Sequence, residues 1–140
     1  MNKIETADIE RLKKIVKNYQ DLKRQIDVRN ITREQVLDDQ FIQWAITTPL
    51  FNIGEHTNNL SKALTDEYID IPWNKVAGLR HRLVHHYEGT NWSIIVEVVF
   101  DDLPQFVEQI EKSADKLWVA PEPLQPPASI PINQCRRKAR

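Results

Sequence analysis

The chain has 140 residues, of which 41% are hydrophobic and 28% charged, and its formal net charge is −1. This length suits one compact domain, and the ordinary composition excludes wholesale disorder and fibrous repeats. No apolar run approaches the roughly 18 to 20 residues of a membrane span, and the N-terminal segment lacks the apolar stretch of a secretory signal, so we expect a cytoplasmic protein. A single cysteine, Cys135, excludes an intramolecular disulfide and a cysteine-only zinc site.

The chain has only three glycines and no tight Asn-Gly or Asp-Gly loop, which predicts an all-α bundle of about four main helices. Apolar residues spaced by three or four positions predict a first helix over residues 5–26, with a capping box that begins at Asn2. A second box, Thr32 with Gln35, opens a helical segment that runs toward Leu64.

Prolines mark irregularities along this bundle. Pro49 lies inside the second segment, and because proline has no N–H donor we expect one bent helix or two abutting helices there. A loop is expected over residues 65–71. A third helix is predicted over residues 73–88, between Pro72 and Gly89.

The fourth helix is expected to begin after Thr90 or Asn91 and to end near Trp118, with a bend at Pro104. The last twenty or so residues contain five prolines and end in four basic groups, so they cannot form a packed element alone. We therefore divide the chain into a helical domain, residues 1–119, and a Pro-rich basic tail, residues 120–140. The tail is either an unstructured end or a docking arm for a partner or for RNA.

The third helix carries three of the four histidines and an arginine on an apolar face. At about 100° per residue, Arg80 projects from the middle of a face that holds Trp73, Val76 and Tyr87. Because burial of an unpaired charge is costly, Arg80 must meet an acid, a carbonyl cluster, a wet interface or a ligand phosphate. A structural salt bridge with Glu55 is the simplest of these alternatives.

His85 follows Arg80 by five residues, about 140° around an ideal helix, so the two side chains converge only at an irregular helix end or across a two-fold axis. RNA cleavage by attack of the 2′-hydroxyl needs a group that binds the phosphate and a group that exchanges protons, and it needs no metal. Arginine and histidine can supply these two functions. His81 and His85 also have the spacing of a helical metal pair, but no third ligand is nearby, and we expect no metal site. Alternatively, His81, Arg82 and His86 form a solvated polar face.

These residues resemble the HepT-like branch of the HEPN superfamily, the toxin-type ribonucleases paired with minimal nucleotidyltransferases. The core motif of that branch, R-x-x-x-x-H-x-Y, is met by Arg80, His85 and Tyr87. The residue after the motif arginine is commonly asparagine in this branch and is His81 here. The resemblance covers about residues 5–118 and rests further on the segments 53–55, 71–73, 77–87 and 102–104 and on Trp92.

The resemblance implies a metal-independent endoribonuclease toxin of a type VII-like toxin–antitoxin pair, a homodimer that cleaves RNA in a composite cleft. Arg80 would bind and polarise the scissile phosphate, His85 would act in acid–base catalysis and His81 would support them. The cognate nucleotidyltransferase antitoxin, in a complex with this chain, would attach AMP to Tyr87 and so repel RNA. The alternative is a non-catalytic helical subunit that binds nucleotide or the nucleotidyltransferase.

The near-neutral net charge hides a strong segregation along the chain. Residues 1–33 carry nine basic and five acidic groups, residues 34–120 carry six and fourteen, and residues 121–140 carry four and one. RNA binding would therefore rely on the first helix, the tail and the cluster of Arg80 and Arg82, and the acidic remainder suits a basic protein partner. We predict a modest nonspecific affinity for RNA that falls with salt.

Overall fold

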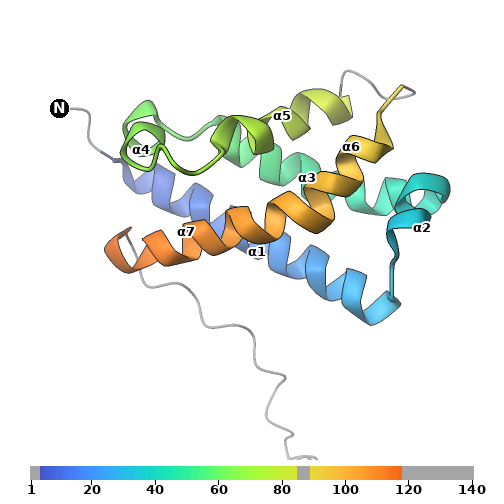
Figure 1. Cartoon of the computed structure of the whole chain (residues 1–140). Coiled ribbons are helices and arrows are strands. Elements are labelled where there is room, and N and C mark those ends of the chain that lie inside the picture. Colours follow the sequence, from blue (N-terminus) through green and yellow to red (C-terminus); the bar gives the residue numbers. More distant parts are fainter. Residues whose placement is uncertain (1–3, 85–88, 118–140) are drawn as a thin grey trace, which may run out of the picture.

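The structure, a computed structural model, describes residues 4–84 and 89–117, and all regular secondary structure within them is helical. The prediction of an all-α bundle is confirmed. Figure 1 shows α1 and α7 crossing each other, with α2 and α4 at opposite ends of the bundle. In chain order the helices are α1 (Thr6–Arg29), α2 (Arg33–Asp38), α3 (Gln40–Asn58), α4 (Lys62–Glu67), α5 (Trp73–Val84), α6 (Trp92–Glu97), the π-helix η1 (Val98–Asp102) and α7 (Leu103–Leu117).

Helix α3 lies between α1 and α5, while α7 packs on α1 and α2 contacts both α3 and α6. One hydrophobic core joins these helices. Each large apolar side chain that folding removes from water contributes roughly 1.5–3 kcal/mol. At the start of α5 the Trp73 ring meets Phe106 of α7 edge to face, with ring centroids 5.6 Å apart, and its Nε1 donates to the carbonyl of Tyr68 at 3.0 Å. These contacts fix α5 against the rest of the bundle.

The start of α1 differs from the predicted one. The helix begins at Thr6, and its capping box is Glu5 with Asp8, not a box that begins at Asn2. Asp8 is fully buried because it also ties α1 to α4: it accepts hydrogen bonds from the backbone N–H and the hydroxyl of Ser61, at 2.8 and 2.6 Å. Burial opposes ionisation of Asp8, but the hydrogen bonds from Ser61 and Glu5 outweigh it and lower the pKa of its carboxyl group.

The predicted box of Thr32 and Gln35 is confirmed and opens α2. The chain then breaks at Asp39, whose carboxylate accepts hydrogen bonds from the first two backbone N–H groups of α3. Of the two alternatives at Pro49, the single helix is correct, because α3 continues through this residue. The loop expected over residues 65–71 is shorter than predicted, since α4 includes residues 65–67.

The irregularity expected at Pro104 takes the form of a π-helix just before it. In η1 the backbone N–H of Leu103 donates to the carbonyl of Val98, five residues earlier. Asn91 caps the start of α6, as one of the two predicted starts required. None of the described helices is long and apolar enough to cross a membrane. The predicted tail, residues 120–140, and residues 85–88 of the predicted third helix lie outside the described residues.

Candidate active site

The site begins where α3 and α5 approach each other at a glycine. A Cβ atom added to Gly54 would lie 2.7 Å from the backbone nitrogen of Arg80 and 3.2 Å from the Cβ of Leu79. Because the first distance is shorter than real Cβ contacts allow and the second is tighter than most, the two helices reach this separation only with glycine at position 54. The same approach places Glu55, the next residue of α3, beside Arg80.

Glu55 and Arg80 form an ion pair between Oε2 and Nε. Asn59, one turn later on α3, donates from its side-chain amide to Oε1 of Glu55 at 3.2 Å, so both carboxylate oxygens are engaged. The two charged side chains are partly exposed, 47% for Arg80 and 36% for Glu55. A pair this exposed contributes only about 0–1 kcal/mol to stability, so its main effect is to orient the guanidinium.

The pairing leaves the outer edge of the guanidinium available. Glu55 contacts Nε, and no described residue accepts a hydrogen bond from the terminal amino groups of Arg80. Those amino groups form the planar fork that binds phosphate oxygens in pairs. The ion pair was one of the alternatives that the sequence left open, and it is compatible with a bound phosphate.

The apolar face of α5 is rotated from the predicted one. The buried residues are Trp73, Val76, Leu79 and Leu83, and Arg80 lies at the edge of this face, not in its middle. The expectation that Arg80 is a charge on an apolar face is therefore wrong, because the face was centred without its two leucines. The cost of burying a charge does not apply to Arg80.

The structure places the other predicted site residues only in part. His81 and Arg82 are exposed on α5, in agreement with the polar-face alternative for these two residues. His85, His86 and Tyr87 lie outside the described residues, so their roles stay predictions. Across residues 4–84 and 89–117, no three His, Cys, Asp or Glu side chains are grouped as metal ligands.

His56 is a neighbour of the site that the sequence analysis left unassigned. It follows Glu55 on α3 and is half-buried against α1. Burial lowers its pKa, and the positive charges of Lys14 and Arg11 lower it further, against the opposing effect of Glu55. The signal that could have found it is its position directly after the Gly54-Glu55 pair. The same electrostatics show that α1 turns two basic groups toward this part of α3.

Much of the remaining positive charge of α1 is balanced locally. Lys17 pairs with Asp21 at 2.8 Å, and Lys23 pairs with Asp27 at 3.2 Å, each one turn apart on the helix. These pairs weaken the expected contribution of the first helix to RNA binding. Among the basic groups of α1, Arg11 and Lys14 are the ones that act on His56, next to Glu55.

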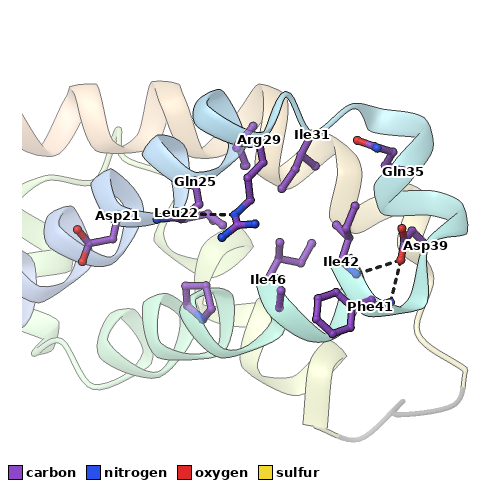
Figure 2. Close-up of a pocket in the computed structure, with 13 residues that line it drawn as sticks. Asp21, Leu22, Gln25, Arg29, Ile31, Gln35, Asp39, Phe41, Ile42 and Ile46 are labelled. Carbon is purple, nitrogen blue, oxygen red and sulfur yellow. Dashed lines mark hydrogen bonds between the residues drawn. The ribbon is translucent and has the colours of Figure 1, made fainter.

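A large apolar cavity lies away from Arg80, between the second half of α1, α2 and the first half of α3. Its volume is about 720 Å³. Figure 2 shows Ile31, Ile42, Ile46 and Phe41 around it, with the side chain of Arg29, which donates a hydrogen bond to Gln25, reaching from α1 toward α3. Sequence periodicity did not predict this cavity, because it depends on the break between α2 and α3.

An all-α bundle that presents an arginine where two helices approach closely is consistent with the helical ribonucleases that the sequence resembles. The chain belongs to the family Ribonuclease HepT-like, which it matches over residues 6–113. A Methanocaldococcus jannaschii protein named as a candidate RNase is 35% identical over 99 residues, which are 70% of this chain and 79% of that protein. No solved structure matches the chain.

Two further relatives carry similar names. A Caldanaerobacter subterraneus protein, also named as a candidate RNase, is 32% identical over 89 residues, 64% of this chain and 80% of that protein. A Thermococcus cleftensis protein named as a probable ribonuclease HepT is 31% identical over 84 residues, 60% of this chain and 76% of that protein. The comparisons support ribonuclease activity in general and RNA as the substrate.

Proposed function

We propose that this protein is a metal-independent endoribonuclease, the toxin of a type VII-like toxin–antitoxin pair, and that it cuts RNA in a cleft shared by two copies of the chain. Membership of the HepT-like family supports the ribonuclease activity. The observation that carries the proposal is the half-exposed Arg80, which Glu55 holds through Nε while no described residue accepts a hydrogen bond from its terminal amino groups.

In the proposed reaction Arg80 binds two non-bridging oxygens of the scissile phosphate. Negative charge builds on these oxygens when the phosphorus becomes five-coordinate, and a preoriented guanidinium stabilises it without reorganising. Glu55 is a positioning residue here, since it holds the guanidinium and does not touch the substrate. His81, next to Arg80 on α5, supplies a further polar group at the cleft.

His85 is proposed as the acid–base group. It takes the proton of the 2′-hydroxyl as that oxygen attacks phosphorus, and it gives this proton to the 5′-oxygen as the bond between phosphorus and that oxygen breaks. The products are a 2′,3′-cyclic phosphate and a free 5′-hydroxyl. A histidine with a pKa near its ordinary value of about 6.5 exchanges protons efficiently at neutral pH, an effect typically worth 10² to 10⁴ in rate.

A second copy of the chain is proposed to complete the cleft, and an exposed apolar stripe on α3 supports it. One face of α3 carries a narrow stripe, about 80° wide, that consists of Phe41, Trp44, Thr48, Phe51 and Glu55. Phe41 and Trp44 are 75% and 58% exposed, which is unusual for large apolar side chains. Because this stripe ends at the partner of Arg80, a copy seated on it would lie beside the site.

Tyr87 is proposed as the acceptor of AMP from the cognate nucleotidyltransferase. An added AMP carries bulk and negative charge, and it would stand two residues from His85 in the sequence. RNA phosphate would be repelled from the same cleft. The modification would thus silence the enzyme without unfolding it.

Cleavage assays with matched variants test the activity. Purified protein is expected to cut RNA in EDTA and to leave 2′,3′-cyclic phosphate ends, and Arg80→Ala or His85→Ala should lose at least 100-fold in rate while staying folded. Arg33→Ala is the matched control, since Arg33 is 48% exposed and also paired with an acid, Asp101. Activity of His85→Ala equal to the wild type would refute the assignment.

Light scattering tests the shared cleft. Trp44→Glu is expected to convert the dimer to a monomer and to lose cleavage, whereas the control Val28→Glu, at a valine 71% exposed on α1, should keep both. Mixing Arg80→Ala with His85→Ala protein should restore part of the activity, because a mixed dimer contains one intact pair. A fully active Trp44→Glu monomer would contradict a shared cleft.

Intact mass spectrometry tests the modification. Co-expression with the cognate nucleotidyltransferase should add the mass of one or more AMP groups to the wild type and none to Tyr87→Phe. Unchanged additions in Tyr87→Phe would place the acceptor elsewhere.

A further inference from the structure

A second, more polar cavity lies where the end of α3 meets the start of α5. Its volume is about 600 Å³, and it is lined by the end of α3, by α4 and by the start of α5. Ala77 of its lining lies three residues before Arg80, about 4.5 Å along the axis of α5 and on the same side of that helix. The cavity is therefore a neighbour of the candidate active site.

The cavity combines an apolar floor with a polar rim. The indole of Trp73 and the side chain of Ile71 are buried at the floor. The rim carries two exposed side-chain amides, Asn58 from α3 and Asn74 from α5. It also carries two lysines and a single acid, which are Lys62, Lys75 and Asp66. A volume of this size is in the range that holds a small organic ligand.

The rim also attracts negative charge. Helix α5 begins at Trp73, and its first residues line the cavity, so the positive end of the helix dipole lies at the rim. Pro72, which precedes the helix, has no side-chain acceptor to cap the N–H groups of the first turn. Lys75 already bonds to Asp102, 3.0 Å from its Nζ. Lys62 has no acidic partner within 4 Å among the described residues, which makes it the main cation at the rim.

We propose that this cavity is a subsite for one nucleotide of the RNA chain, next to the phosphate that Arg80 binds. The base lies on the apolar floor and meets the amides of Asn58 and Asn74, which can each donate and accept hydrogen bonds at a base edge. The phosphate of that nucleotide lies toward Lys62 and the first turn of α5. This inference rests on the proposed function and gives the enzyme a means of preferring one nucleotide beside the cut.

Binding of an RNA that cannot be cleaved separates this proposal from the cleavage activity. The probe is a 2′-O-methyl tetraribonucleotide, in which the attacking hydroxyl is blocked. We expect it to shift the side-chain amide NMR signals of Asn58 and Asn74, which the variants Asn58→Ala and Asn74→Ala identify. Lys62→Ala should weaken binding at least threefold at low salt and reduce the slope of log K against log salt by about 0.7.

Lys112→Ala is the matched control, because Lys112 is an exposed lysine on α7 that pairs with Glu108 and does not line the cavity. It should leave the affinity and the salt slope unchanged. In cleavage assays Lys62→Ala should raise KM severalfold and leave kcat unchanged, and Asn74→Ala should alter the preference for the nucleotide beside the cut.

The outcomes distinguish the two proposals. If the amides of Asn58 and Asn74 shift with RNA but the wild type cuts no RNA, the subsite stands and the proposed function fails. If RNA is cut but these amides do not shift, or if Lys62→Ala binds the probe as the wild type does, the subsite is overturned. Shifts caused by the nucleotidyltransferase and not by RNA would overturn it in favour of a protein-binding surface.

Discussion

Replacing Gly54 by alanine probes the approach of α3 and α5 on which the site depends. The new Cβ would lie 2.7 Å from the backbone nitrogen of Arg80, so α5 must move by at least 0.3 Å to reach the 3.0 Å limit for such contacts. Backbone cannot rotate away as a flexible side chain can. Such overpacking typically costs about 1–3 kcal/mol.

Gly78→Ala is a control within the same pair of helices, because a Cβ at Gly78 meets no atom within 4 Å. Both substitutions gain helix propensity, about 0.8–1 kcal/mol each, so Gly78→Ala should stabilise the protein by about that amount. Gly54→Ala should be about 1–3 kcal/mol less stable than Gly78→Ala in urea unfolding, and slower in RNA cleavage because Arg80 is displaced. Equal stabilities of the two variants would refute the close approach at Gly54.

Other predictions concern stability. Asp8→Ala should lose about 1–3 kcal/mol, since Ser61 is left without its acceptor. The pKa of Asp8 is lowered, so the ionised carboxylate contributes fully to the free energy of unfolding above the unfolded-state pKa of about 3.9, and this contribution is lost as the pH falls through the folded-state pKa. Acid unfolding curves of the wild type and Asp8→Asn should therefore differ in that pH range. The pKa of His56 is also lowered, so wild-type stability should fall as the pH drops below about 6.5, and His56→Gln should lose that part of the pH dependence. Thr32→Ala should cost about 0.5–2 kcal/mol in thermal or urea unfolding, because it removes the cap of α2; an unchanged stability would argue against the cap.

Short-range signals in the sequence were enough to predict most of the helices. The box of Thr32 and Gln35 was predictable because both halves of the interaction lie within one turn. Pro49 was misleading as a possible break: the carbonyl that loses its donor belongs to Ala45, an exposed residue that water can reach, so the helix continues. The real break at Asp39 has a local signal in the sequence, an aspartate able to cap the next helix.

The site was less predictable, because it depends on how two helices meet. The motif pointed to Arg80, but its pairing with Glu55 follows from the close approach at Gly54, twenty-six residues earlier in the chain. No periodicity within the sequence of α5 indicates how this helix is aligned against α3. The error in the buried face of α5 has the same origin, since Leu79 packs toward the core and turns the helix so that Arg80 reaches the edge.

The π-helix η1 lets the second half of the chain carry one residue more than a regular helix would. A π-helical turn contains one residue more than an α-helical turn, so the residues 98–102 turn the chain through about the same angle as one residue fewer of α-helix. Deleting one residue there would restore a regular helix and leave α7 in nearly the same register, with Leu103, Phe106 and Ile110 still facing the core. Related sequences should therefore tolerate a one-residue gap within this segment, and a gap placed there in an alignment indicates a relative whose helix is regular.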